Sequence, residues 1–457
     1  MLRFFRINDP YRLVVIFLIL VIVRLIQGYF ISDYSYYELK WLLLGEWLAK
    51  GFNMYTETFD YTGPFAAVIY KSLDLLLGRT PFSFYIFSTL LIILHASIFN
   101  SLLLKNKVYN ENSYLPAFLY VLLIVSIPDF MTLSPQLMSL TFVLLTLRNV
   151  LRRIDNQVTD ELFLTSGIYI GIASMLYLPS AVFFLVFLFS LILFTTAIFR
   201  RLALYFFGFI LVFSLCWVYY YFMDSAPLFL ERFLIDGLLA NSSKSTPIMD
   251  LLLIAGPLGL IFLFSVFKTL GSARLTNFQQ KVQQVFWIFL VGALVTFTLS
   301  IEKSVFELLF LVPVIAYFLT HYFILIRKRI AVAIMPGLVI FGLLSFSIYS
   351  YQDLTKSLTL DSTIPSKEGI MVLGEKLEVY SEAEMLTPCF SHYVSKRALG
   401  RIDYYTDATL FYDLLIQSDP EIIVDELELM TKLKFRFPYL EENYTKVDEK
   451  TYRKINN

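Results

Sequence analysis

Long apolar runs recur through the first 350 residues of the chain, separated by short polar segments. A helix needs about 20 predominantly apolar residues to cross a membrane. By this measure the sequence predicts about eleven spans, at residues 11–32, 82–104, 114–128, 131–147, 163–178, 180–199, 202–222, 249–268, 284–300, 305–325 and 330–350. The first run is too long for a cleavable signal peptide, lacks a small-residue cleavage site and carries Arg24. We therefore expect residues 1–350 to form an all-α polytopic membrane domain.

Residues 33–81, between the first two spans, contain two apolar stretches that are too short or too polar to cross a membrane. The first stretch has an apolar face at helical spacing, formed by Tyr37, Trp41, Leu44 and Leu48. Glu46 and Lys50 fall on the opposite face, as expected for a helix that lies in the membrane interface. The second interfacial helix is expected to begin at Pro64 and to end at Gly78, because Pro favours the first turn of a helix and Gly its end.

Residues 351–457 follow a different pattern, typical of a small α/β domain. The runs 370–374 and 421–425 indicate two short buried strands, and the first of them ends in a glycine. A helix is expected after the second strand, and the last fifteen residues have the pattern of a hairpin.

The composition agrees with this division. Of 457 residues, 58% are apolar, 17% aromatic and only 16% charged, whereas an ordinary soluble domain carries about 25% charged residues. These values exclude a disordered chain, and two cysteines are too few for a disulfide framework. The formal net charge of zero is the sum of two unlike parts, since residues 1–350 carry 24 Lys and Arg against 18 Asp and Glu, and residues 351–457 carry 13 against 19.

The distribution of cations predicts the orientation of the chain. With the N-terminus in the cytoplasm, the inner segments carry sixteen Lys and Arg residues and the outer loops between spans carry seven. Cytoplasmic loops of membrane proteins are enriched in cations. We therefore expect a multi-pass protein of the inner (plasma) membrane, with its N-terminus inside and an extracytoplasmic domain at residues 351–457.

Four polar residues within the predicted spans need partners, because charged groups in hydrocarbon are costly. Arg24 lies in the middle of the first span, where a partner from another span is as reasonable as a substrate role. Glu307 follows Lys303 by four residues, a spacing that allows an ion pair. His95 and His321 lie in different spans without nearby acidic residues, so we expect buried, hydrogen-bonded histidines and no metal site.

The densest candidate for chemistry is the start of the first outer loop. Asp33 lies where the first span leaves the membrane, beside several tyrosines, and Glu38 follows five residues later. A carboxylate at this boundary suits a general base that meets an amphipathic substrate, because partial desolvation raises its pKa. Alternatively, Asp33 caps the next helix and Glu38 is solvated. Both interpretations are compatible with the spacing.

The first outer loop has a characteristic order of motifs. Its early acidic residue is followed by Tyr36, Leu44-Gly45, Gly51, Met54-Tyr55, Asp60-Tyr61-Thr62-Gly63-Pro64 and Leu75-Leu76-Leu77-Gly78-Arg79. This order resembles that of the GT-C superfamily of membrane glycosyltransferases. The run 55–64 is similar to the stretch where the protein-mannosyltransferase and aminoarabinose-transferase branches carry a Lys-Pro-Pro-Leu-like motif. The run 419–425 resembles a strand in the outer domains of several bacterial members.

This resemblance implies an enzyme that takes a sugar from a polyprenyl-phosphate donor and transfers it to a glycan, lipid or protein acceptor on the outer face. An acidic residue of the first outer loop, Asp33 or Glu38, is then the general base. The chain departs from the family pattern in having no Asp-Glu or Asp-Asp pair in the first outer loop, no Lys-Pro-Pro and no Asp-x-Asp metal motif. We therefore expect a transferase without cofactor or metal, and without a nucleic-acid partner.

The donor phosphate requires cations at the outer face, and an apolar groove must accept the isoprenoid. The residues that we expect at the substrate site are Tyr37, Asp60, Lys71, Arg79, Arg232 and Lys303. For each cation the alternative is that the side chain extends to membrane lipid headgroups.

Two other functions remain as alternatives. A lipid-linked glycan transporter or polymerase also has many spans, but its cations would lie within the spans, where Arg24 is the only one at mid-span. A catalytically silent scaffold of an envelope complex would keep the fold without the chemistry, and the missing acidic pair favours it slightly.

Overall fold

The computed structural model describes residues 2–30, 35–58, 60–154, 160–195, 198–239, 248–272, 275–325, 369–374, 380, 384–385 and 404–455. The chain divides into two compact units. The helical unit comprises Met1–Asp33, Phe82–Trp217 and Lys244–Thr355, and the mixed unit comprises Tyr34–Pro81, Val218–Ser243 and Lys356–Asn457. The loop after the first span and the C-terminal domain therefore belong to one unit. The predicted domain boundary at residue 350 lies outside the described residues.

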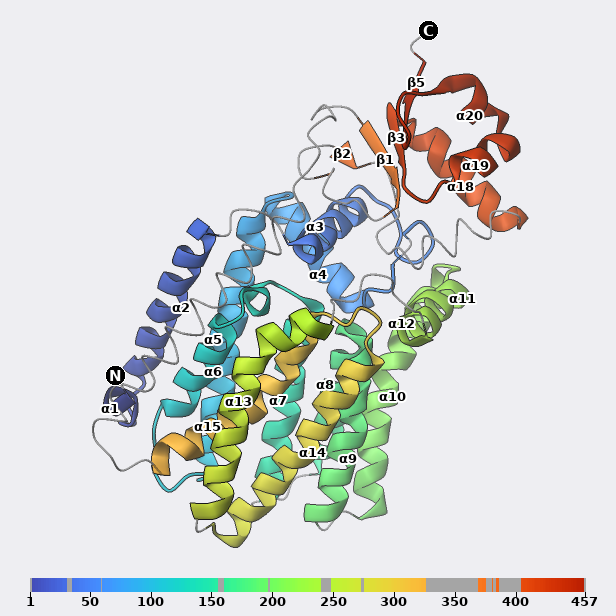
Figure 1. Cartoon of the computed structure of the whole chain (residues 1–457). Coiled ribbons are helices and arrows are strands. Elements are labelled where there is room, and N and C mark those ends of the chain that lie inside the picture. The colour runs from blue at the N-terminus through green and yellow to red at the C-terminus, as the bar shows by residue number, and fades with distance from the viewer. Residues whose placement is uncertain are drawn as a thin grey trace. The chain divides into compact units, whose positions relative to one another are not determined.

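The helical unit is built from long apolar helices (Figure 1). Its elements are α1 (Leu2–Phe5), α2 (Tyr11–Phe30), α5 (Pro81–Lys105), α6 (Leu115–Val125), η1 (Pro128–Met131), α7 (Pro135–Ile154), α8 (Glu161–Leu176), η2 (Leu178–Ala181), α9 (Val182–Phe194), α10 (Phe199–Phe222), α13 (Ile248–Ser272), α14 (Asn277–Leu299), η4 (Val305–Leu311) and α15 (Val312–Leu325). The last residues of α10 pass into the mixed unit. Apart from the short α1, the described helices of this unit fall within or next to the predicted apolar runs.

The prediction of an all-α membrane body is confirmed. Six helices of the described chain are long and apolar enough to cross a membrane: α2, α5, α10, α13, α14 and the stretch Val305–Leu325. Three further apolar stretches, Leu115–Val125, Glu161–Leu176 and Leu178–Phe194, are shorter. Proline stands at the start of η1, α7 and η2, which limits the neighbouring helices. The number of about eleven spans stays a prediction, and the span at 330–350 lies outside the described residues.

Glycines bring α8 and α10 into backbone contact. A Cβ atom on Gly167 would lie 2.1 Å from the carbonyl oxygen of Tyr205, and one on Gly208 would lie 2.4 Å from that of Leu164. Small residues at such positions allow close van der Waals packing between membrane helices, where lipid removes the hydrophobic driving force for association.

Glu307 lies in a buried polar cluster of the helical unit. Its carboxylate accepts hydrogen bonds from Gln136 Nε2 at 3.0 Å, from Ser300 Oγ at 2.9 Å and from the Tyr177 hydroxyl. The prediction that it pairs with Lys303 is wrong, because the three donors surround the buried carboxylate while Lys303 is exposed.

Arg24 finds its partners on neighbouring elements, one of the two alternatives left open by the sequence. Its guanidinium donates to the carbonyl oxygens of Tyr85 at 3.0 Å and Met131 at 2.8 Å, and to Thr89 Oγ1 at 2.5 Å. The side chain therefore connects α2 with α5 and η1.

The two membrane histidines are buried and hydrogen-bonded, as predicted. His95 Nε2 lies 2.7 Å from Thr141 Oγ1, and its Nδ1 lies 3.2 Å from the Tyr120 hydroxyl. His321 Nε2 lies 3.2 Å from the Tyr317 hydroxyl. The His95 imidazole therefore connects α5 with α6 and α7, and that of His321 contacts a tyrosine one turn earlier in α15.

The mixed unit combines short helices with one sheet. Its helices are α3 (Tyr36–Ala49), α4 (Pro64–Leu77), α11 (Ala226–Phe229), the π-helical turn η3 (Leu230–Ile235), α12 (Asp236–Leu239), α18 (Tyr405–Ser418), α19 (Met430–Arg436) and α20 (Pro438–Asn443). Its strands are β1 (Gly369–Leu373), β2 (Glu384–Met385), β3 (Ile422–Asp425), β4 (Tyr444–Lys446) and β5 (Thr451–Lys454).

The sheet has the order β2-β1-β3-β5-β4. β1 is parallel to both β2 and β3, with Ile370 opposite Ile422, whereas β3–β5 and β4–β5 are antiparallel. The two predicted strands, the helix after the second strand and the C-terminal hairpin are all confirmed. A parallel pair requires a crossover connection, and α18 lies in the segment between β1 and β3.

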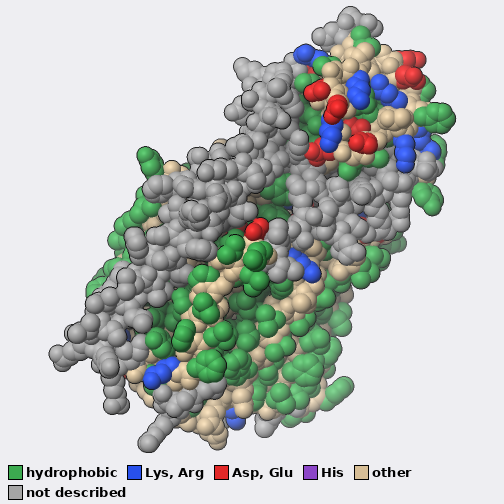
Figure 2. Space-filling model, viewed as in Figure 1, with side chains coloured by type: hydrophobic (Ala, Val, Ile, Leu, Met, Phe, Trp, Pro, Cys, Tyr) green, Lys and Arg blue, Asp and Glu red, His purple; other side chains and the backbone are tan. Residues whose placement is uncertain are grey.

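The surfaces of the two units differ in character. Apolar side chains cover the visible face of the helical unit, whereas Lys, Arg, Asp and Glu side chains gather on the sheet domain (Figure 2). On α13, for example, Leu252, Leu260 and Phe264 are exposed. Lipid is the environment that accepts such a surface, so the chain is a membrane protein.

Candidate functional site

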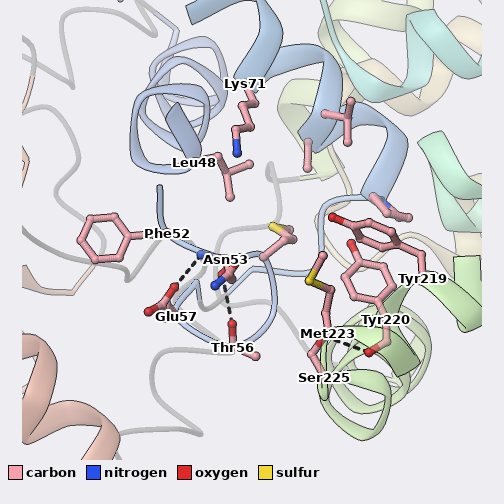
Figure 3. Close-up of a pocket in the computed structure, with 14 residues that line it drawn as sticks. Leu48, Phe52, Asn53, Thr56, Glu57, Lys71, Tyr219, Tyr220, Met223 and Ser225 are labelled. Carbon is pink, nitrogen blue, oxygen red and sulfur yellow. Dashed lines mark hydrogen bonds between the residues drawn. The ribbon is translucent and has the colours of Figure 1, made fainter. Parts of the chain in front are cut away.

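A pocket of about 420 Å³ opens within the mixed unit (Figure 3). It is lined by residues from the end of α3, the loop that follows, the first half of α4 and the end of α10: Leu48, Phe52, Asn53, Met54, Thr56, Glu57, Pro64, Ala67, Val68, Lys71, Tyr219, Tyr220, Met223 and Ser225. The lining has an apolar wall, two tyrosines, one cation and one carboxylate.

One face of α4 forms a wall of the pocket. Pro64, Ala67, Val68 and Lys71 are spaced three, four and seven residues from the first, which places them in one stripe of a helix. α4 begins directly after Gly63, with Pro64 in its first turn, and ends at Gly78, as the sequence predicts. The start of α4 thus determines where Lys71 enters the pocket.

α3 and α4 pack closely against each other. A Cβ atom on Gly45 would lie 2.8 Å from the carbonyl oxygen of Tyr70, and the Trp41 and Tyr70 rings stack at 6.1 Å. Most residues of α3 are buried, including Glu38 at 5% exposure and Lys40 at 2%. The alternative in which Glu38 is solvated is therefore wrong, and Ser35 occupies the N-cap position of α3.

The loop between α3 and α4 is held by aromatic packing. Tyr55 has a left-handed backbone with φ of 69°, and its side chain is fully buried. Its ring lies 5.3 Å from that of Tyr220 and 5.6 Å from that of Phe229, and its hydroxyl donates to the Thr62 carbonyl at 2.7 Å. Because a left-handed tyrosine is strained, this packing keeps the loop in one conformation.

Arg232 holds the same loop from η3. It is 7% exposed, and its Nη1 donates to the carbonyl oxygen of Thr58 at 2.9 Å and contacts that of Thr56 at 3.5 Å. π-Helical turns are rare and occur often near functional sites. The sequence predicts Arg232 as a substrate-binding cation, and the structure places its guanidinium on the backbone of the pocket loop.

Glu57 is the carboxylate of the pocket. Its Oε2 accepts the Asn53 backbone N–H at 2.6 Å, and its own N–H donates to the Asn53 carbonyl at 3.2 Å. Thr58 Oγ1 also donates to that carbonyl at 3.2 Å. These bonds close a tight turn that presents Glu57 at the pocket wall.

Lys71 is the cation of the pocket. It is half-buried, and within the described chain its ammonium has no ion-pair partner. It is the one predicted site residue, among those that the structure describes, that lines the pocket. Cations at such a position attract anionic groups.

Asp60 lies in a buried ion pair just before α4. Its side chain is fully buried, and Oδ1 lies 3.7 Å from Lys40 Nζ. The carboxylate also accepts from the backbone N–H of Tyr61 at 2.7 Å and from Thr62 Oγ1 at 2.9 Å. Lys40 lies over the Tyr61 ring at 4.7 Å. These contacts stabilise the segment that leads into α4, and neither Asp60 nor Lys40 is among the residues that line the pocket.

Arg79 pairs with Glu46 at the far end of the same helix pair. Arg79 Nη1 lies 3.0 Å from Glu46 Oε2, and Lys50 Nζ lies 3.1 Å from Glu46 Oε1. Burial, and then the neighbouring Glu46, raise the pKa of the Asp74 carboxyl above its ordinary value of 3.8, and Arg79 and Lys50 offset part of this rise. Arg79 thus belongs to a charge cluster outside the pocket lining.

The remaining candidates are placed elsewhere. Tyr37 is half-buried on α3, with its ring 6.2 Å from that of Trp41. Lys303 is exposed in the helical unit, before η4. Asp33 lies outside the described residues. No group of three His, Cys, Asp or Glu residues that could hold a metal ion occurs in the described part of the chain.

Four residues of the pocket lining are not among those predicted from the sequence: Asn53, Glu57, Tyr219 and Tyr220. The first two lie between helices in a run without periodicity, and the two tyrosines lie at the end of a span, where aromatic residues are common. The stripe that begins at Pro64 is the signal that could have indicated a pocket beside α4.

Comparisons with known proteins connect this architecture to one class. No protein-family model matches the sequence, and no curated protein matches it either. Among solved structures, the chain is similar to ArnT from Cupriavidus metallidurans bound to undecaprenyl phosphate, with a TM-score of 0.59 and 13% identity over 98% of this chain and 99% of that one. It is also similar to the apo oligosaccharyltransferase of Archaeoglobus fulgidus, with a TM-score of 0.50 and 11% identity over 93% of this chain and 71% of that one.

The chain has the fold of the GT-C glycosyltransferases. The resemblance seen in the sequence is thereby confirmed at the level of the fold, across nearly the whole length of the chain. At this identity the similarity defines architecture, and chemistry must be argued from the residues themselves.

Proposed function

We propose that this protein transfers a sugar from a polyprenyl-phosphate donor to a glycan, lipid or protein acceptor at the outer face of the membrane. The observation that carries the proposal is Lys71, an unpaired cation within the described chain, in a pocket of a GT-C fold. The ArnT structure with the same architecture was solved with undecaprenyl phosphate bound. The apolar wall beside Lys71 suits the first isoprenoid units.

The proposed reaction is an inverting displacement at the anomeric carbon. A carboxylate, Asp33 or Glu38, takes the proton of the acceptor hydroxyl or amine, and the acceptor atom forms a bond to that carbon. The bond from the anomeric carbon to the phosphate oxygen breaks, and the polyprenyl phosphate leaves with the electron pair. Lys71 stabilises the charge that grows on the leaving phosphate.

The orientation and cofactor requirements form part of the proposal. An inner-membrane protein with residues 351–457 outside would hold the mixed unit on the side where lipid-linked sugars are consumed. The sequence contains no Asp-x-Asp motif, which supports transfer without a metal ion.

The test is transfer of a labelled sugar from a lipid donor by purified protein in nanodiscs. Asp33→Asn and Glu38→Gln are measured separately, after membrane insertion and thermal stability are shown to match the wild type. Loss of about 10²–10⁴-fold is expected for the variant that lacks the base. Full activity in both variants would reject these two residues as the base. Activity that survives EDTA supports the metal-free reaction, and activity restored only by a divalent cation contradicts it.

A further inference from the structure

Glu57 has a carboxylate in the pocket that no step of the proposed reaction uses. One of its oxygens, Oε2, is held by the Asn53 N–H at 2.6 Å. Within the described chain no hydrogen bond or ion pair occupies Oε1. One end of the carboxylate is therefore held by the loop, and the other is available to accept a hydrogen bond.

The loop that carries Glu57 is unusually constrained. Arg232 binds its backbone at the Thr58 carbonyl, and Tyr55 is buried among aromatic rings of residues 220–233. Functional groups that must discriminate between similar ligands are held by such supporting contacts, because a displacement of 1 Å weakens a hydrogen bond. The position of Glu57 is thus prepared before any ligand enters.

The pocket places Glu57 and Lys71 on different walls. Lys71 extends from α4, and Glu57 extends from the loop after α3 (Figure 3). The two side chains form no ion pair with each other in the described chain. A phosphate beside Lys71 would be repelled by a carboxylate at the same spot, so Glu57 must face a different, uncharged part of the ligand.

We propose that Glu57 is a specificity-determining residue that accepts hydrogen bonds from hydroxyl groups of the sugar ring of the donor. This inference rests on the proposed function. A carboxylate accepts hydroxyl donors at several lone pairs, and Tyr219 and Tyr220 line the same pocket. Lys71 then binds what all donors share, the phosphate, and Glu57 binds what distinguishes them, the sugar.

The experiment measures binding to the full chain in nanodiscs by isothermal titration calorimetry. The probes are farnesyl phosphate and farnesyl phosphates that carry glucose, galactose, mannose or arabinose. We expect the wild type to bind at least one glycosylated probe more tightly than farnesyl phosphate. Glu57→Gln keeps an oxygen for the Asn53 N–H and is expected to weaken that binding about tenfold, leaving farnesyl phosphate unchanged. Lys71→Gln is expected to weaken the binding of farnesyl phosphate and of the glycosylated probes alike.

Two further variants complete the test. Glu57→Ala should lose the same discrimination, and Glu442→Gln, an exposed carboxylate of α20, is the matched control without effect. Equal binding of every glycosylated probe by wild type and Glu57→Gln overturns the inference and leaves the proposed function standing. If the wild type binds neither farnesyl phosphate nor any glycosylated probe, the proposed function itself fails.

Discussion

Charged side chains are buried or half-buried in both units, but their hydrogen bonds and ion pairs are satisfied differently. In the helical unit, the Glu307 carboxylate accepts three hydrogen bonds from protein donors, and Arg24 donates to two carbonyls and a hydroxyl. In the pocket of the mixed unit, Glu57 is held at one oxygen, and Lys71 has no ion-pair partner in the described chain.

The difference separates structural from functional polarity. A buried group that serves the fold must have its partners built in, because an unsatisfied group costs about 1–3 kcal/mol. A group that binds a ligand must have a hydrogen-bonding position or a charge that no protein group occupies before the ligand binds. Stability should therefore respond to changes in the first class, and binding should respond to changes in the second.

The largest expected effect comes from the buried ion pair of Lys40 and Asp60. Asp60→Ala removes the carboxylate that faces the buried Lys40 ammonium and should lower the free energy of unfolding by about 4 kcal/mol. Denaturant titration of the purified protein in detergent measures this loss. The double variant Asp60→Ala/Lys40→Met should recover at least half of it. If the single variant is as stable as the wild type, Asp60 belongs with the open groups of the pocket.

Glu307 tests the satisfied class within the helical unit. Glu307→Ala removes the acceptor of the Gln136 and Tyr177 donors and one of the two acceptors of Ser300 Oγ, and should cost about 3 kcal/mol in the same titration. Tyr177→Phe removes one donor only and should cost about 1 kcal/mol. An equal cost for the two variants would contradict the view that the carboxylate organises the cluster.

Lys71 tests the second class, the polar groups that serve a ligand. Lys71→Gln should reduce sugar transfer about 100-fold, because a positive charge near the leaving phosphate is lost. The free energy of unfolding should stay within about 0.5 kcal/mol of the wild type, since the side chain has no ion pair to lose within the described chain. Lys71→Arg keeps the charge and should retain more activity. A large loss of stability in Lys71→Gln would move this residue into the structural class.

Asp74 gives the smallest effect and tests the charge cluster outside the pocket. Its pKa is raised in the folded protein, so the folded state binds the proton more tightly than the unfolded chain. The stability associated with this group is therefore present below about pH 4 and is lost as the pH rises through the folded-state pKa. Asp74→Asn should raise the free energy of unfolding at pH 7 by about 0.5 kcal/mol, which thermal unfolding detects as a higher unfolding temperature. This gain should vanish below pH 4. A gain that is equal at both pH values would exclude the burial of the Asp74 carboxylate and its repulsion by Glu46 as the cause.

Much of the fold could be predicted because its signals are local. Apolar runs indicated the described spans, Pro64 and Gly78 marked the ends of α4, and the apolar runs 370–374 and 421–425 marked two neighbouring strands. Each of these signals lies within a few residues of the element that it predicts.

The pocket could not be predicted, because it is assembled from segments far apart in the sequence. Nothing in the run around Glu57 indicates that Tyr219 and Tyr220 line the same pocket. The contacts of two predicted cations could not be predicted either. Arg79 forms an ion pair with Glu46, and Arg232 donates a hydrogen bond to a backbone carbonyl. A sequence shows that a cation is present, and the fold decides whether it is available to a ligand.

The hydrogen bond from Arg232 to the pocket loop has a consequence for biosynthesis. Arg232 and Thr58 are 174 residues apart, and Tyr55 likewise depends on rings from α10 and α11. Membrane proteins are made from the N-terminus onward, so the loop emerges long before the residues that fix it. Several helices are therefore inserted before this loop can form its native contacts. The pocket is complete only after residues 218–239 have been synthesised. A chain truncated before Val218 would have the cation and the carboxylate of the pocket and would lack Tyr220, Phe229 and Arg232, whose contacts fix the loop that carries Glu57.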